Sequence, residues 1–364
     1  MKAAGENISL ALKSQHLPPD TLLKSIPVAD VNSIGFKTFA YFNKTSQNQP
    51  EGFDLKSIPF PFYLDDMKSQ FVRVQLFLDT SKMSVDDSSY LVLLTELWLQ
   101  SPLKHPDTGE VETLQELIAK RSAVLVSLKN NLGYDGSKFS PGTYSHLLMF
   151  NVEATIEKYS EAIHILRDTL FNVDFTEERV RTVISQLLNG IPGDKLSAAT
   201  VVKTLADNMY FNDKNNIHFS SFLRQQKFLN ASLQSLKDDP TKLIRKLSAI
   251  REALVTPANC MAFVSVELSR LQLVVGKDGA EVWKNFFPET SPSINLLRRD
   301  VSKEIEIIPE YFNRNKFPNL RHAIIGLPGK KFENIFLSWE VKKFKLKCTI
   351  IIIINFITIL NGMN

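Results

Sequence analysis

Residues 71–100 read FVRVQLFLDTSKMSVDDSSYLVLLTELWLQ, and this stretch contains both regular patterns that the chain uses. In its first third, every second residue is a branched apolar one: Val72, Val74, Leu76 and Leu78. That alternation is typical of a strand with one face on a hydrophobic core. In its last third, leucines and a tryptophan recur at helical spacing and leave almost no polar side, which predicts a buried helix over residues 86–101. The stretch therefore predicts a strand followed by a buried helix.

The same two patterns recur along the chain. Helices are expected at residues 113–121, 156–170, 176–188 and 196–211, and in a segment that starts at Asp239 and Pro240. Strands are expected at residues 123–128 and 144–152, joined as a hairpin by a turn rich in glycine, and at residues 260–268. This order predicts an α+β fold with helices on one face of a mostly antiparallel sheet.

Changes in composition divide the chain into four ranges. Residues 1–68 are rich in proline and polar residues, which indicates a linker. Residues 69–270 contain the α+β unit. Residues 271–341 contain a loop-rich crossover and the truncated start of a second unit, with strands expected near 304–308 and 321–326. Residues 342–364 are a tail that does not follow the pattern.

The composition is that of a folded protein, with 44% hydrophobic and 23% charged residues. The net charge of +4 is small and forms no basic stripe, so we expect no nucleic-acid partner. Two cysteines, Cys260 and Cys348, exclude a disulfide scaffold and fit a reducing compartment. The first 25 residues show no secretory signal. We therefore expect a cytoplasmic protein, or a mitochondrial one if the true amino terminus is missing.

The tail, residues 342–364, changes abruptly to lysine and isoleucine. Its apolar part, residues 348–360, is shorter than the roughly 18–20 residues that cross a bilayer, and Asn355 interrupts it. We interpret the tail as a truncation or splice artefact and do not expect a membrane partner. A membrane anchor is the alternative interpretation.

The sequence has no motif of a catalytic metal site. A zinc peptidase needs two histidines on one helix face beside a glutamate, because the imidazoles hold the metal and the carboxylate takes a proton from its bound water. Neither HExxH nor HxxEH occurs, and the six histidines are isolated from one another. Glu161 and His164 form one ExxH pair without the second copy that a di-iron bundle requires. We expect no metal and no cofactor in this chain.

Three stretches carry a family resemblance: residues 17–36 (LPPDTLLKSIPVADVNSIGF), residues 71–103, and residues 144–189 (YSHLLMFNVEATIEKYSEAIHILRDTLFNVDFTEERVRTVISQLLN). Together with the order of elements, they resemble the pitrilysin, or insulin-degrading-enzyme, class of inverted zinc metallopeptidases, and within it the presequence-protease-like branch. The resemblance implies units of the LuxS/mitochondrial-processing-peptidase-like fold, four to a complete enzyme, with zinc in the first. It places residues 1–68 in the linker between the halves, residues 69–270 in the third unit, and residues 271–341 at the start of the fourth.

The resemblance also aligns the expected helix 86–101 with the helix that carries HxxEH in a zinc-bearing unit. Glu96 then stands at the position of the catalytic base, and Leu93 and Leu97 replace the two histidine ligands. Gln186 falls approximately at the position of the third ligand, a glutamate. Leucine has no lone pair to offer a metal, so no part of the zinc site is carried over, and zinc is expected only in the complete family enzyme.

The resulting hypothesis is a noncatalytic carboxyl-half portion of a presequence-protease-like zinc metalloendopeptidase. Such a portion contributes chamber wall and peptide-binding surface, and it meets peptide substrates through a catalytic half. It is expected to be inactive alone. Two alternatives stay open: a scaffold or binding subunit that pairs in trans with a catalytic half, and a membrane-tethered remnant that uses the tail.

Overall fold

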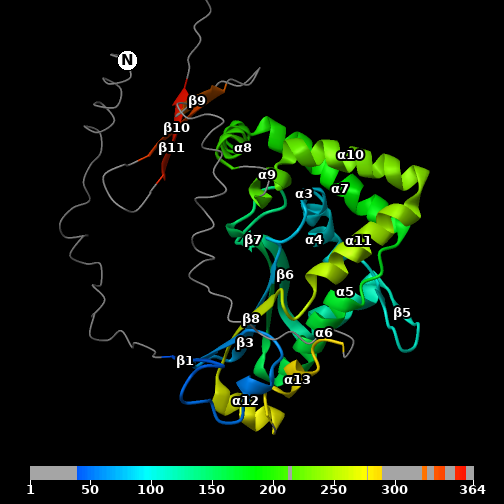
Figure 1. Cartoon of the computed structure of the whole chain (residues 1–364), viewed down its shortest axis with the longest axis vertical. Helices are drawn as coiled ribbons and strands as arrows, with labels where there is room; N and C mark the ends of the chain where they lie inside the picture. Colours follow the sequence, from blue (N-terminus) through cyan, green and yellow to red (C-terminus); the bar gives the residue numbers. More distant parts are fainter. Residues whose placement is uncertain are drawn as a thin grey trace, which may run out of the picture. The chain divides into compact units, whose positions relative to one another are not determined.

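The computed structural model describes residues 39–211, 215–276 and 278–288, and the backbone of three further strands between residues 322 and 357. Its main body, residues 39–288, is built on a six-stranded sheet (Figure 1). The strand order is β1-β2-β8-β3-β7-β6, and only the pair β2 and β8 is parallel. The strands are β1 (Ala40–Asn43), β2 (Phe62–Asp66), β3 (Phe71–Asp79), β6 (Leu125–Tyr134), β7 (Thr143–Thr155) and β8 (Cys260–Val266).

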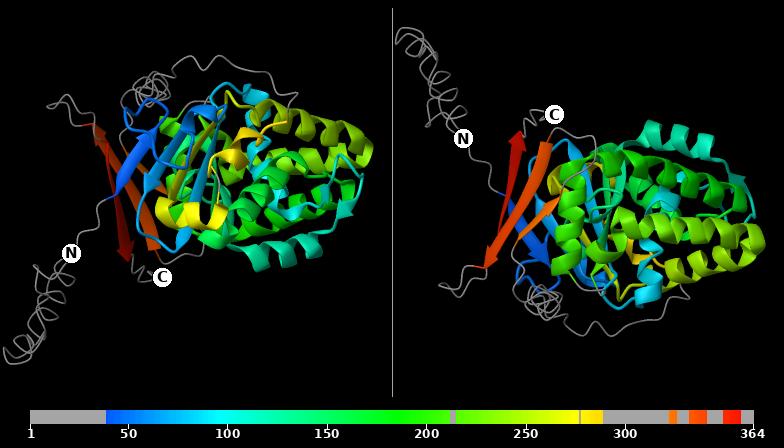
Figure 2. Two further views of the ribbon diagram at one scale, coloured as in Figure 1. Left: turned by 90° about the horizontal axis from the view of Figure 1, so that it is seen from below. Right: turned by 90° about the horizontal axis from the view of Figure 1, so that it is seen from above.

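Helices cover one face of this sheet, as the two views of Figure 2 show. The expected α+β class, with a mostly antiparallel sheet and helices on one side, is therefore confirmed. The longer helices are α4 (Leu91–Gln100), α5 (Leu114–Val124), α6 (Tyr159–Phe171), α7 (Glu177–Leu196), α8 (Ala198–Tyr210), α10 (Phe222–Asp238), α11 (Pro240–Leu254) and α12 (Leu268–Val275). The short elements are β4 (Leu103–Lys104), β5 (Val111–Glu112), η2 (Leu55–Ser57), η3 (Ile156–Lys158), α3 (Val85–Ser88), α9 (Asn216–Ser220) and α13 (Glu281–Lys284).

Strand β3 follows the alternation that its sequence predicts. Its even-numbered residues from Val72 to Leu78 are at most 1% exposed and face the helices. The expected hairpin is also present, as β6 and β7. Its turn depends on glycine, since Gly133 has a φ of +69° and a Cβ on Gly142 would lie 1.7 Å from the Tyr134 carbonyl oxygen. Only glycine combines that backbone freedom with that close approach.

The prediction of one helix over residues 86–101 is wrong in one respect, because two helices occupy this segment. The hydroxyl of Ser84 accepts a hydrogen bond from the Asp87 amide and caps α3, and the Ser88 hydroxyl donates to the Ser84 carbonyl. The chain begins α4 again at Leu91. Serine hydroxyls compete for backbone groups in this way and favour caps over helix interiors. The serines at 88 and 89 therefore separate the capping turn α3 from the buried helix α4.

Helix α10 is an element that the sequence pattern did not single out. Its buried residues follow helical spacing, but two of the five are polar: Phe222, Gln225, Leu229, Ser232 and Leu236. The Gln225 side-chain NH2 donates inside the protein to the carbonyls of Phe219 and Ser89. A buried stripe with polar members lacks the continuous apolar face on which recognition of a helix depends. By contrast, α11 begins as expected, with Asp239 as its cap and Pro240 in its first turn.

The main body extends beyond the predicted limits 69–270 at both ends. Strands β1 and β2 lie within residues 1–68, the range interpreted as linker, yet they complete one side of the sheet. Aromatic residues explain the extension, because rings from before β3 and from after β8 pack into one cluster. Its ring pairs, with centroids 5.1–6.2 Å apart, are formed by Phe53, Phe60, Phe62, Phe171, Trp283, Phe286 and Phe287.

A separate three-stranded antiparallel sheet has the order β11-β10-β9, with β9 (His322–Ile325), β10 (Phe332–Glu340) and β11 (Thr349–Ile357). Strand β9 agrees with the strand expected near 321–326, while the strand expected at 304–308 lies outside the described residues. Strand β11 belongs to the tail, residues 342–364, and pairs along its whole length with β10. Among the described residues, no helix has the length and apolar character that a bilayer crossing requires.

Candidate functional site

Helix α4 carries the positions that align with HxxEH, and it lies inside the main body. Leu93 and Leu97 are both 0% exposed and belong to the hydrophobic core. On the same helix, the Trp98 ring meets the Phe150 ring of β7 edge to face at 5.3 Å. The face of α4 that carries Leu93 and Leu97 is therefore a packing surface.

Glu96 points to a different neighbourhood from the two leucines. Its carboxylate accepts a hydrogen bond of 2.9 Å from the Gln100 side-chain amide. The Lys138 ammonium, from the turn between β6 and β7, lies 3.8 Å from the same oxygen. The Glu96 side chain is 19% exposed. Its contacts are those of an acid that ties α4 to the turn.

Gln186, the approximate third-ligand position, is not brought to these residues. It lies on the exposed side of α7, whereas Val183, Ile184 and Leu187 of the same helix are buried. No cluster of three or more histidine, cysteine or acidic side chains with metal-binding geometry occurs within the part of the chain that the structure describes. Leu93, Glu96, Leu97 and Gln186 thus occupy three separate environments: core, turn contact and solvent-facing helix.

The sheet face that the helices leave open carries an aromatic row, which the sequence analysis did not find. Tyr41, Tyr63 and Phe263 stack in sequence, with ring centroids 6.0 Å and 4.5 Å apart and interplanar angles of 20° and 14°. The edge of Phe77 meets Phe263 at 5.8 Å. The four rings come from β1, β2, β8 and β3, so one row crosses four neighbouring strands.

A charged row runs beside the aromatic row on the same face. In the sheet register, Asp65 is opposite Ser265, Ser265 is opposite Arg73, and Arg73 is opposite Glu153. The Ser265 hydroxyl donates to the Asp65 carboxylate at 3.2 Å. Directly opposite residues in a sheet have neighbouring side chains. The open face therefore offers alternating acid and base next to aromatic rings.

These two rows form the candidate functional site, because they combine apolar contact with charge on one accessible surface. Tyr41 is 48% exposed, whereas Phe77 is 9% exposed, so the aromatic row passes from an accessible edge to a covered centre. Only one signal in the sequence points to the row: Phe77 stands at an outward position of β3 where the strand otherwise carries Arg73 and Gln75. Of the other three rings, Tyr63 and Phe263 are opposite each other in the strand register and Tyr41 stacks diagonally on Tyr63, an arrangement that a single sequence does not give.

Comparison with known proteins gives distant relatives. No family model matches the chain. The chain is 24% identical over 246 residues to an uncharacterized protein of Schizosaccharomyces pombe, covering 64% of this chain and 24% of the relative. It is 22% identical over 261 residues to an uncharacterized protein of Caenorhabditis elegans, covering 70% and 25%. The chain therefore spans about a quarter of the length of these curated relatives.

Among solved structures, the chain is similar to the peptidase M16 inactive domain from Pseudomonas fluorescens. The alignment covers 65% of this chain and 50% of that one, with 12% identity and a TM-score of 0.45. This score describes a partial overlap of two structures, so no role of that domain passes to this chain.

Proposed function

We propose that this chain is a noncatalytic α+β unit of a pitrilysin-class, presequence-protease-like zinc metallopeptidase, and that it contributes peptide-binding wall to the chamber of that enzyme. The zinc and the general base belong to another unit. The observation that carries the proposal is the full burial of Leu93 and Leu97, the two residues that the resemblance aligns with the histidine ligands. The buried face of α4 then has a structural role. Contact with the substrate is assigned to the open face of the sheet.

The open face has the chemistry of a surface for extended, mixed-composition peptides. Aromatic rings supply large contact area with few rotatable bonds to fix on binding. The charged row of Asp65, Arg73 and Glu153 supplies both signs of charge next to them. Such a surface suits many peptide sequences at modest affinity. The relatives support a unit that is part of a longer chain, because the matched region is about a quarter of their length.

The first experiment measures catalysis by the purified chain. Quenched fluorogenic peptides are incubated with the chain, with and without added zinc and a chelator. No turnover and no stoichiometric zinc are expected, because the α4 positions offer leucine side chains to a metal. Chelator-sensitive cleavage, or one tightly bound zinc per chain in plasma emission analysis, would contradict the proposal.

The second experiment measures peptide binding by fluorescence anisotropy of labelled, unstructured peptides of about 20 residues. The double variant Tyr63→Thr/Phe263→Thr removes the closest ring pair, 4.5 Å apart, while threonine keeps strand propensity. At least fivefold weaker binding is expected. Leu273→Ala is the matched control, because Leu273 is an apolar side chain that is 86% exposed on α12. Equal binding by the parent chain and the double variant would refute the role of the open face.

Co-purification distinguishes a unit that works within one long chain from a subunit that pairs in trans. A separately expressed HxxEH-bearing protein that co-purifies with this chain and acquires peptidase activity favours pairing in trans. Recovery of the chain without such a partner favours the single-chain arrangement.

A further inference from the structure

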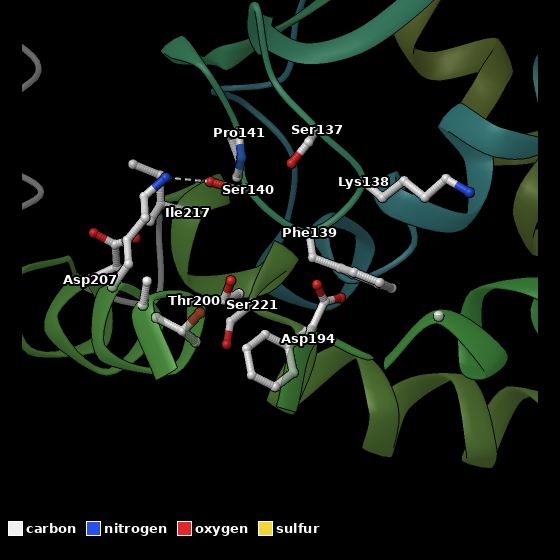
Figure 3. A pocket seen from close by; sticks show the side chains of 15 residues that line it. Ser137, Lys138, Phe139, Ser140, Pro141, Asp194, Thr200, Asp207, Ile217 and Ser221 are labelled. Carbon is white, nitrogen blue, oxygen red and sulfur yellow. Dashed lines mark hydrogen bonds between the residues drawn. The ribbon is translucent and has the colours of Figure 1, made fainter. Parts of the chain in front are cut away.

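A cavity of about 600 Å³ lies away from the open face of the sheet. Its walls are the β6–β7 turn at residues 137–141, the end of α7, one side of α8 and the start of α10, as Figure 3 shows. A cavity of this size is in the usual range for a small ligand or a large side chain. Neither the positions aligned with HxxEH nor the aromatic row line it.

Two lysines and two aspartates line the cavity, and their other contacts leave one negative charge without a partner among the described residues. Lys203 donates a hydrogen bond of 2.7 Å to the Ser140 hydroxyl, and its charge acts on Asp207. Lys138 extends away from the cavity in Figure 3, toward Glu96. Asp194, by contrast, has no ion-pair partner in the described ranges. The two lysines are engaged with the protein, so one carboxylate is left over for a cation.

Asp207, on α8, is a second acid that lines the cavity, on the side opposite Asp194 in Figure 3. Burial raises the pKa of its carboxyl to about 6, against the smaller opposing effect of Lys203. At neutral pH this group is therefore a partly desolvated carboxylate, which the protein holds at a cost to its stability. A group of this kind in a cavity is a frequent property of a binding site.

Ser221 provides an independent sign of a missing ligand. The residue is 4% exposed, lines the cavity, and its hydroxyl has no hydrogen-bond partner in the part of the chain that is described. It precedes α10 at the position where a serine usually caps the helix, but its side chain makes no capping bond. Buried hydroxyls are almost always paired. The free oxygen is consistent with a donor group that enters from the cavity.

Part of the remaining lining is apolar and would pack against a hydrocarbon stem, beside hydroxyl residues that also line the cavity: Ser137, Ser140, Thr200 and Thr204. Phe139 and Pro141 come from the turn, and Ile217 and Phe222 come from α9 and α10. Phe222 is 1% exposed, so its ring is a fixed part of the wall. Aromatic faces also attract a cation through their quadrupole. The walls therefore combine surfaces for an aliphatic chain with acceptors for a positive head.

We propose that this cavity binds an alkylammonium or alkylguanidinium group, with Asp194 and the Ser221 hydroxyl as acceptors, Asp207 as a further negative charge on the opposite side, and the apolar part of the walls around the stem. The group has two possible sources: a lysine or arginine side chain of a bound polypeptide, or a free amine such as a polyamine. The polypeptide source rests on the proposed function, whereas the free amine does not.

The test uses the whole chain and the fluorescent primary amine dansylcadaverine as probe, with its N-acetyl derivative as the uncharged match. Saturable binding of the amine is expected, with at least tenfold weaker binding of the acetylated probe. Asp194→Asn should weaken amine binding about tenfold, and Asp207→Asn, which removes a charge on the opposite side of the cavity, should weaken it less. The control Glu252→Gln changes an acid that is 72% exposed and outside the cavity, and it should leave binding unchanged.

Competition then identifies the source. Displacement by spermidine indicates a free amine. Displacement by a lysine-containing pentapeptide, but not by its norleucine counterpart, indicates a polypeptide. The proposal is overturned by equal binding of both probes, by unchanged amine binding in Asp194→Asn, or by failure of both competitors. The variant Tyr63→Thr/Phe263→Thr separates the two proposals, because it should lose peptide binding at the open face and keep dansylcadaverine binding in the cavity.

Discussion

At the scale of single residues, Leu93 and Leu97 decide what α4 does. Each is completely buried, and burial of a leucine contributes about 2 kcal/mol to folding. Imidazoles at the same positions would enter a hydrophobic core with no third ligand, since Gln186 lies on the exposed side of α7. The two leucines therefore stabilise the packing of this helix and offer no lone pair to a metal.

Replacing Asp207 tests how much its partly buried carboxylate destabilises the folded protein. Its folded-state pKa of about 6 is above the ordinary value of 3.8 for this side chain because burial disfavours the charged form. The folded state therefore binds more protons than the unfolded state between pH 4 and 6, and the free energy of unfolding falls as pH rises through that window. We expect Asp207→Asn to be more stable than the parent at pH 7.5, by about 1–2 kcal/mol after allowance for partial exposure and for Lys203.

Urea denaturation at two pH values measures this effect. At pH 4 the parent carboxyl is largely protonated, so the two proteins should have similar free energies of unfolding, and the difference should appear only at pH 7.5. Glu252→Gln, at an exposed acid, should show no such dependence. A variant that is less stable than the parent at pH 7.5 would show that the Asp207 carboxylate stabilises the fold.

At the scale of elements, a buried phenol on α6 forms hydrogen bonds with the segment after β8. The Tyr159 hydroxyl, on α6, donates to the Gly279 carbonyl and accepts from the Trp283 indole, each at 2.8 Å. Burial raises the pKa of Tyr159, so the phenol stays protonated and remains a donor. We expect Tyr159→Phe to lower the free energy of unfolding by about 1–3 kcal/mol, because it leaves a buried indole N–H and a buried carbonyl unpaired.

Thermal and urea denaturation of Tyr159→Phe measure this loss, and Trp283 fluorescence reports on the segment itself. Tyr134→Phe is the control, since Tyr134 is 38% exposed and no described side chain bonds its hydroxyl. Equal stability of Tyr159→Phe and the parent would show that the aromatic cluster alone holds α13 in place.

Elements with local signals could be predicted from the sequence, and elements that depend on distant partners could not. Strand β3 has its alternation and α11 has its Asp239 and Pro240 start, so both are correct within a residue or two. Strand β2 is held by β8, about 200 residues further along the chain, and nothing in its own five residues indicates this. The same reason hides the aromatic row, because rings on four strands become neighbours only through register.

At the scale of the whole molecule, the body is closed by residues from its two ends. Phe60 and Phe62 precede the first strand predicted for the α+β unit 69–270, and Trp283 and Phe286 follow the last strand predicted for that unit. All four side chains are at most 1% exposed. These rings pack residues from before β3 directly against residues from after β8. The independently folding part should therefore be residues 39–288 and not residues 69–270.

Two shortened chains test this boundary. The chain 39–288 should be monomeric in size-exclusion chromatography and should unfold in one cooperative thermal transition. The chain 69–270 lacks β1 and β2, which leaves β8 with an unpaired edge, and it lacks Phe60 and Trp283 from the core. Each lost ring removes about 2–3 kcal/mol of burial, and an exposed apolar edge promotes association. It should therefore aggregate or show no cooperative transition, whereas a monomeric 69–270 that melts at the same temperature as 39–288 would show that the ends are accessories to the fold.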